Sequence, residues 1–286
     1  MINGIININK PDAVTSFQVV SLVKRKLGIK RVGHLGTLDP AGCGVLPIAV
    51  GKATKLFDYF LNKRKVYRAI FCFGKETDTL DSDGVVVKEV NKTITLKNIN
   101  SVIHNLIGEL EQLPPKYSAK SINGVRAYEL ARNNIEFELK PKNITVYRFV
   151  AIEELSTNTF LFEIECSAGC YIRSLCRDLA YLLGTVAYMP LIIRTNSGLF
   201  SIENSISHIE LTNSEDITPY ITNIEDILPY ERLHLNEIET KKIKSGLKLN
   251  QIKADNLYLL FDENNEFFAL GKIENNLLKM EIYFGD

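Results

Sequence analysis

The stretch GHLGTLDPAGCGVLPIAVG, residues 33–51, contains a single carboxylate, Asp39, among Gly, Ala and other uncharged residues. An Asp followed by Pro most often marks an ordinary turn. Glycines, however, also allow a bulky ligand to approach the backbone closely. Because the stretch shows neither a helical nor a strand period, we predict a structured loop that presents Asp39.

Positive charge is concentrated around this stretch. Residues 1–70 contain 12 Lys or Arg and 3 Asp, a net charge of +9, although the 286-residue chain as a whole has 34 basic and 34 acidic residues. The excess lies in KRKLGIKR (24–31) and KRKVYR (63–68). Such runs are usually solvated surface, but two of them beside a Gly-rich segment favour a phosphate-rich partner.

The composition, 45% hydrophobic and 24% charged, is typical of a globular protein with one large domain or two unequal ones. The start, MINGIININKPD, lacks a signal-peptide pattern, and no run approaches the roughly 18 apolar residues of a membrane helix. We therefore expect a cytoplasmic protein that does not enter a membrane. Five cysteines without a secretory signal predict reduced thiols, and their spacing predicts no zinc site.

The order of predicted elements favours an α+β fold. Strands are predicted at 4–10, 66–73, 144–154 and 158–167, and helices at 16–27, 53–62, 96–108, 124–133 and 171–183. The first helix has a capping box, TSFQ, and ends at Gly28. Segment 74–84 is predicted to form turns. Because strands and helices alternate without a regular βαβ rhythm, a doubly wound sheet is disfavoured.

The last part of the chain has a different composition. Beyond about residue 210 it becomes acidic, and 221–233 is predicted to be a connector. Three short strands are predicted at 258–263, 266–273 and 279–284. They predict a small β-rich module at the C-terminus.

Seven segments, in order along the chain, resemble the TruB family of tRNA pseudouridine synthases. They are KP (10–11), GHLGTLDPAGCGVLPIAVGKATK (33–55), KVYRA (65–69), GKETDTLDSDG (74–84), QLPPKYSAKSINGVRAYELAR (112–132), CSAGCYIRSLCRDLAYLLG (166–184) and RTNSGLF (194–200). The resemblance implies the pseudouridine synthase catalytic fold, with a central mixed, largely antiparallel sheet, in residues 1–222. It implies a small PUA-like RNA-binding module in residues 223–286.

The family resemblance also implies an activity. A protein of this kind isomerises uridine-55 in the T-loop of tRNA to pseudouridine by base flipping and a carboxylate nucleophile, and a role in tRNA folding is also expected. The implied partner is the T-arm elbow of tRNA, bound by a monomer. Because isomerisation involves no net oxidation or reduction, neither a cofactor nor a metal is expected.

The matching motifs assign roles to individual residues. Asp39 is the implied nucleophile, because a carboxylate can bond covalently to the sugar or the base during the exchange. Arg173, in CYIRSL, is the implied partner of that carboxylate. Tyr67 is expected to stack on the target base and to remove the C5 proton. His34 is expected to hold the extruded base, and Lys10 to support the catalytic loop.

Further residues are expected to bind the substrate. Tyr171 lies in the CYIRSL motif, and Lys24, Arg25, Lys63 and Arg64 are candidates for contacts with RNA phosphates.

The chain departs from the family pattern at two places. Ile193 stands where the family commonly has a second arginine beside Arg194, and Cys170 replaces the usual Thr. These departures concern RNA contacts and the packing behind Arg173.

Two alternatives to tRNA isomerisation stay open. One is a factor that binds or refolds the tRNA elbow without chemistry. The other is an enzyme that acts on other RNAs in a guide complex, which the chain length and the lack of additional basic tails disfavour.

Overall fold

The computed structural model describes residues 2–118, 120–122, 124–133 and 135–285. Residues 119 and 123, which belong to the segment 112–132 with the family-like motif, lie outside the described residues.

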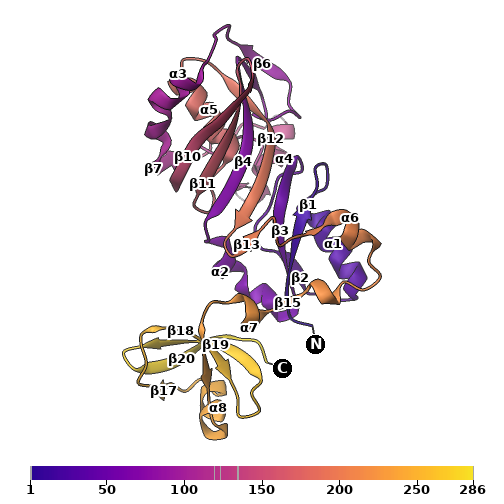
Figure 1. Cartoon of the computed structure of the whole chain (residues 1–286), viewed down its shortest axis with the longest axis vertical. Helices are drawn as coiled ribbons and strands as arrows, with labels where there is room; N and C mark the ends of the chain where they lie inside the picture. Colours follow the sequence, from indigo (N-terminus) through magenta and orange to yellow (C-terminus); the bar gives the residue numbers. More distant parts are fainter. Residues whose placement is uncertain (1, 119, 123, 134, 286) are drawn as a thin grey trace.

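Within the described residues, eleven strands form one sheet (Figure 1), in the order β14-β1-β3-β12-β4-β11-β10-β7, with β2, β13 and β15 paired beside this path. The bounds are β1 (Gly4–Lys10), β2 (Val32–His34), β3 (Gly42–Val50), β4 (Lys65–Phe73), β7 (Gly108–Gln112), β10 (Lys142–Ser156), β11 (Thr159–Cys166), β12 (Ala187–Ser197), β13 (Phe200–Ser201), β14 (Ile206–Ser207) and β15 (Thr222–Asn223). Among the described strands of this sheet, only the pairs β1–β14 and β12–β3 are parallel. The prediction of an α+β fold with a mixed, largely antiparallel sheet is confirmed.

The remaining elements before the C-terminal part surround this sheet. They are α1 (Ser16–Leu27), η1 (Gly51–Leu56), α2 (Phe57–Leu61), β5 (Lys75–Thr77), β6 (Val86–Glu89), α3 (Leu96–Val102), η2 (Ile103–Leu106), β8 (Ser121–Ile122), β9 (Val125–Arg126), α4 (Ala127–Arg132), α5 (Ile172–Leu182), α6 (His208–Asn213), η3 (Thr218–Tyr220) and α7 (Ile224–Ile227). No described helix is long and apolar enough to cross a membrane.

The helix α1 begins and ends where the sequence predicts. The Thr15 side chain accepts a hydrogen bond from the Gln18 amide, and the Gln18 side chain accepts one from the Thr15 amide. Gly28 ends the helix with a left-handed φ of 66°, a conformation that costs glycine little.

The predicted loop at 33–51 is wrong over most of its length. Its second half is the strand β3, of which all residues from Gly44 to Val50 are buried. Its first part includes β2, which pairs with the end of β3. Only residues 35–41 form the loop that carries Asp39. Between β3 and β4, the helix predicted at 53–62 begins as the 3₁₀ helix η1 and continues as the α-helix α2.

The C-terminal part is a small sheet with one helix, drawn in yellow and light orange in Figure 1. Its strands have the order β16-β18-β19-β20-β17. The bounds are β16 (Glu231–His234), α8 (Glu237–Lys244), β17 (Leu249–Asn250), β18 (Asn256–Phe261), β19 (Phe267–Glu274) and β20 (Leu277–Tyr283). The three predicted strands are confirmed as β18, β19 and β20, with ends that differ by a few residues.

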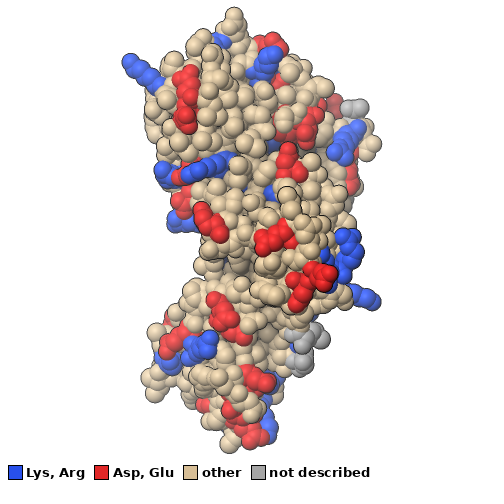
Figure 2. Space-filling view, turned by 45° about the vertical axis from the view of Figure 1, so that its right-hand side comes forward, with Lys and Arg blue, Asp and Glu red and all other residues tan. Residues whose placement is uncertain are grey.

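A shared apolar cluster joins the C-terminal part to the large sheet. It packs Ile5, Val45 and Phe60 with Phe261 and Phe284. At the same junction the hydroxyls of Tyr59 and Tyr230 are 2.7 Å apart. Figure 2 shows this junction as a waist in the surface, and both charge signs are mixed over the face it presents.

Candidate active site

Asp39 lies in the short loop between β2 and β3, and its side chain is about half exposed (47%). The Gly42 amide donates to the Asp39 carbonyl at 2.9 Å and closes a tight turn. The carboxylate is therefore accessible to a ligand, while its backbone is fixed by the turn.

Three buried side chains from other elements hold the Asp39 loop by its backbone. Lys10 Nζ donates to the Pro40 carbonyl at 3.0 Å. The Ser16 hydroxyl pairs with both the amide and the carbonyl of Leu38, each at 3.0 Å. Arg194, only 1% exposed, donates through Nη2 to the Gly36 carbonyl at 3.0 Å.

The Arg194 guanidinium makes two more hydrogen bonds, one to the same loop and one to β3. It donates to the Thr37 carbonyl at 3.3 Å and to the Val45 carbonyl at 2.8 Å. Each of these carbonyls thus receives a charged donor, which makes the loop conformation well determined.

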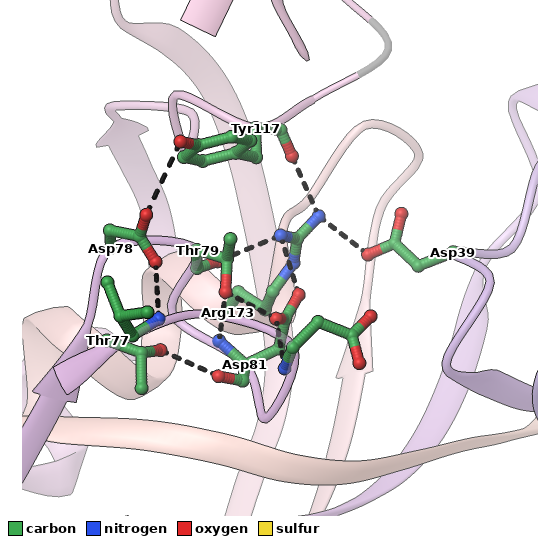
Figure 3. Close-up of polar contacts among 9 residues, drawn as sticks. Asp39, Thr77, Asp78, Thr79, Asp81, Tyr117 and Arg173 are labelled. Carbon is green, nitrogen blue, oxygen red and sulfur yellow. Dashed lines mark hydrogen bonds and ion pairs between the residues drawn. The ribbon is translucent and has the colours of Figure 1, made fainter. Parts of the chain in front are cut away.

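Arg173 approaches Asp39 from the first turn of α5 (Figure 3). Its Nη2 atom lies 2.7 Å from Asp39 Oδ2 and 3.0 Å from the Tyr117 carbonyl. Its Nη1 atom lies 3.0 Å from Asp81 Oδ2 and 2.9 Å from the Thr79 carbonyl. Because the guanidinium is planar, these four partners fix both its position and its plane.

The helix that carries Arg173 is itself anchored. The Gln112 side chain accepts a hydrogen bond from the Tyr171 amide at 2.8 Å and donates to the Tyr171 carbonyl at 3.0 Å. Burial raises the pKa of the Tyr171 phenol, and the charge of Asp39 raises it further. Tyr171 therefore lies within electrostatic reach of the carboxylate.

Tyr67 and His34 are less accessible than Asp39. Tyr67, on β4, is 7% exposed and pairs in register with Arg194 on β12. Burial raises the pKa of Tyr67 above its ordinary range, and the Arg194 guanidinium opposes this rise. Burial, followed by the charge of Arg194, lowers the pKa of His34. The buried Nδ1 atom of His34 has no hydrogen-bond partner among the described residues.

Among the described residues, the ion-pair partner of Asp39 is Arg173, not one of the four basic residues predicted to bind RNA. Lys24 and Arg25 are in the last turn of α1. Lys63 Nζ lies 4.0 Å from the centre of the Tyr59 ring, beside the junction with the C-terminal part. Arg64 is paired with Glu165 at 3.1 Å. They mark separate surface positions.

Asp81 and Arg194 were not predicted as site residues. Asp81 belongs to the segment 74–84, predicted only as turns, although this segment was one of those that resemble the family. Arg194 was noted only as part of a departure from the family pattern. A buried arginine within a strand leaves no local sequence signal when its partners are backbone carbonyls far away in the chain, as they are here.

The site contains no arrangement typical of a metal centre. Within residues 2–118, 120–122, 124–133 and 135–285, no group of three or more His, Cys, Asp or Glu side chains is placed to hold an ion. All five cysteines are free. A hollow of about 490 Å³ between α5 and β7 is lined by residues such as Leu110 and Tyr181, and Asp39, Tyr67 and Arg173 do not line it.

Comparison with known proteins identifies the family of the chain. Residues 24–172 match the family model described as "TruB family pseudouridylate synthase (N terminal domain)". A tRNA pseudouridine synthase B of Clostridium perfringens is 39% identical over 288 residues, with 98% of each chain covered. A tRNA pseudouridine synthase B of Clostridium tetani is 42% identical over 280 residues, covering 94% of this chain and 95% of the relative.

A solved structure shares the fold. The chain superimposes with a TM-score of 0.71 and 23% identity on a chain of an H/ACA ribonucleoprotein bound to a substrate RNA containing 2′-deoxyuridine, covering 99% of this chain and 85% of the other. The family-model match covers more than half of the chain, and the relatives are aligned over nearly its full length. The chain belongs to the TruB family of pseudouridylate synthases.

Proposed function

We propose that this protein isomerises uridine-55 in the T-loop of tRNA to pseudouridine, with Asp39 as the nucleophile. The observation that carries the proposal is the half-exposed Asp39 carboxylate held 2.7 Å from the buried Arg173 guanidinium. Its nearly full-length relatives are named tRNA pseudouridine synthase B, which supports the same reaction and the same class of substrate.

The reaction requires three changes at the uridine. The bond between ribose C1′ and uracil N1 breaks, the base turns, and C1′ bonds to C5. The C5 proton is lost and N1 gains one, so product and substrate have the same composition. A carboxylate that bonds transiently to the sugar or the base can hold one fragment during the rotation. Arg173 keeps Asp39 in one orientation, because the contacts of its guanidinium with Asp81, Thr79 and Tyr117 prevent the arginine side chain from turning away.

The surrounding residues have supporting roles in this proposal. Lys10 and Arg194 position the loop through its carbonyls. His34, whose buried Nδ1 has no partner within the described part of the chain, is proposed to help hold the extruded base. Tyr67 supplies an aromatic face for stacking. Burial raises the pKa of its phenol, so removal of the C5 proton by Tyr67 would depend on the neighbouring Arg194 to stabilise the phenolate.

The proposed substrate is reached only after extrusion of the target. Unstacking the uridine from the folded elbow costs a few kcal/mol, and stacking and phosphate contacts on the protein compensate for this cost. We assign residues 1–222 to the catalytic part and 223–286 to a PUA-like RNA-binding module. Tyr171, Lys63 and Arg64 are proposed substrate contacts, and the protein is proposed to act as a cytoplasmic monomer.

The test is the substitution Asp39→Asn, assayed for pseudouridine in a T-arm stem-loop RNA and for binding of the same RNA. Loss of product with binding retained would support the assignment, because Asn keeps the shape but cannot act as a nucleophile. Unchanged product formation would overturn it.

The same experiment addresses a factor that only binds or refolds the elbow. For such a factor, the wild-type protein would bind the RNA and form no pseudouridine. Unfolding kinetics of the elbow with wild-type and Asp39→Asn protein would then be equal. Equal acceleration by both proteins, together with product from the wild type alone, would indicate both functions.

A further inference from the structure

The exposed face of α1 carries an aromatic ring at one end and cations at the other. Phe17, the second residue of the helix, is 72% exposed. Lys24 and Arg25 follow on the same face, since positions seven and eight residues apart lie two turns along a helix. The opposite face, with Val19 and Val23, is buried in the main core.

The ring end of this face is fastened to the catalytic loop. Ser16, directly before Phe17, bonds both backbone groups of Leu38, which directly precedes Asp39. Lys10 joins the same two segments, because its Nζ donates to the Val14 and Pro40 carbonyls. Phe17 therefore stands on the rim of the site, on a helical turn that the capping box makes rigid.

The cation end lies about 10 Å from the ring along the helix axis, at about 1.5 Å per residue. Lys24 and Arg25 form no ion pair with any described residue, whereas the adjacent Lys26 donates to the Ser214 carbonyl at 2.6 Å. Cations in a last turn interact favourably with the helix dipole. The helix dipole does not explain why the Phe17 ring is exposed to solvent at the other end of α1.

We infer that the exposed face of α1 binds the RNA strand that flanks the target uridine, with Phe17 stacking on an unpaired base and Lys24 and Arg25 contacting phosphates. The inference rests on the proposed function and adds a surface to it. Aromatic side chains that stack on bases beside a positively charged track are the usual means of holding single-stranded RNA. The Phe17 end of this face is connected to the loop that presents Asp39 through the hydrogen bonds between Ser16 and Leu38.

The test measures binding in the Asp39→Asn background, in which turnover does not interfere. A T-arm stem-loop RNA carries 2-aminopurine at each nucleotide next to the target in turn. Phe17→Ala should weaken binding roughly tenfold and abolish the fluorescence quenching at one of these positions. Phe17→Trp should restore both. The control is Ile152→Ala, which removes an exposed apolar side chain (45%) from β10, outside every surface assigned to RNA here.

A second arm tests the cations. The double substitution Lys24→Ala, Arg25→Ala should reduce the slope of log affinity against log salt by about 1.4, since each phosphate that a cation neutralises on a single strand contributes about 0.7. Lys97→Ala, which removes an exposed cation on α3, should leave the slope unchanged.

The outcomes separate this inference from the proposed function. If Phe17→Ala binds RNA as tightly as its parent, with the quenching retained, α1 is not an RNA surface, even when Asp39 proves to be the nucleophile. The same conclusion follows if Trp fails to rescue a protein with an unchanged melting temperature. If wild-type protein forms no pseudouridine, the proposed function fails, while the binding arms still decide the role of α1.

Discussion

Arg173 places four oxygen atoms around one guanidinium, two from carboxylates and two from backbone carbonyls. Its side chain is 6% exposed, whereas Asp39 is 47% exposed. The arginine is thus a fixed part of the protein interior, and Asp39 is the member of the pair that reaches the solvent. This asymmetry suits a pair in which one member reacts and the other does not move.

We predict that Arg173→Lys lowers the single-turnover rate about 100-fold, because an ammonium cannot hold Asp39 and Asp81 in one plane, and small misplacements of a reacting group are costly. The measurement is pseudouridine formation at saturating enzyme. RNA affinity should change little. Arg177→Lys, one turn later on α5, is the control and should keep the rate. A similar loss in both variants would contradict the positioning role.

Lys65 gives a prediction about pH. It is 5% exposed and donates to the Leu61 and Lys63 carbonyls. Burial lowers its pKa to about 8 from 10.5. Since the folded pKa lies below the unfolded one, the unfolded chain binds more protons between these values, and the contribution of Lys65 to stability rises with pH in that window.

The check is the free energy of unfolding in denaturant for wild type and Lys65→Met between pH 7 and 10. The free energy of unfolding of the wild type should increase relative to that of the variant as the pH rises above about 8, with a slope of at most about 1.4 kcal/mol per pH unit. For Lys97→Met, which changes an exposed lysine, the curve of unfolding free energy against pH should be parallel to that of the wild type. Parallel curves for Lys65→Met would disprove the lowered pKa.

At the scale of elements, the helix α1 links the stability of the fold to the position of the loop that carries Asp39. We predict that Thr15→Ala costs about 1 kcal/mol through the lost cap and also lowers activity, because Ser16 in the same turn bonds Leu38. Thr95→Ala removes the equivalent capping box from α3, far along the chain from Asp39, and should cost similar stability with no loss of activity. Urea unfolding and a turnover assay measure the two effects. Equal activities in the two variants would argue against this coupling.

The same scale shows what the sequence could predict. The strands β1 and β4, with alternating burial, and the helix α1, with both caps written in the sequence, were predicted almost to the residue. The strands β3 and β12 were missed. β3 is buried on both faces, so its sequence shows no alternation, and Gly44 and Pro47 within it are residue types that are depleted in strands.

The predicted site shows a similar limit. The family-like motifs singled out Asp39, Arg173 and Lys10, and the structure brings all three to one loop; the roles assigned to them stay predictions. Arg194 and Asp81 could not be assigned, because their importance arises only when the parallel pairing of β12 with β3 and the docking of α5 bring distant segments together. Basic residues were identified by composition alone, which cannot say that Arg64 is paired with Glu165.

At the scale of the whole molecule, the C-terminal part and the large sheet share one apolar cluster. Leu35, at the start of the Asp39 loop, belongs to this cluster together with Phe261. We predict that Phe261→Ala costs about 3 kcal/mol or more and lowers activity as well. Phe268→Ala, in the separate core of the C-terminal part, should destabilise that part and leave the rate largely intact at low temperature. Calorimetry and turnover assays distinguish the two variants, and an unchanged rate in Phe261→Ala would contradict the coupling.

The hydrogen bonds that hold the Asp39 loop have a consequence for the synthesis of the protein. Arg194 follows Gly36, whose carbonyl it binds, by 158 residues. The strand β1 pairs with β14 at Ile206 and with β15 at Thr222, so both of these partners are synthesised long after β1 itself. A nascent chain on the ribosome therefore carries Asp39 early, but the Arg194 contacts that hold its loop form only after most of the chain has emerged. Such long-range contacts favour slow folding, and a chain terminated before residue 194 lacks the Arg194 contacts to the Asp39 loop.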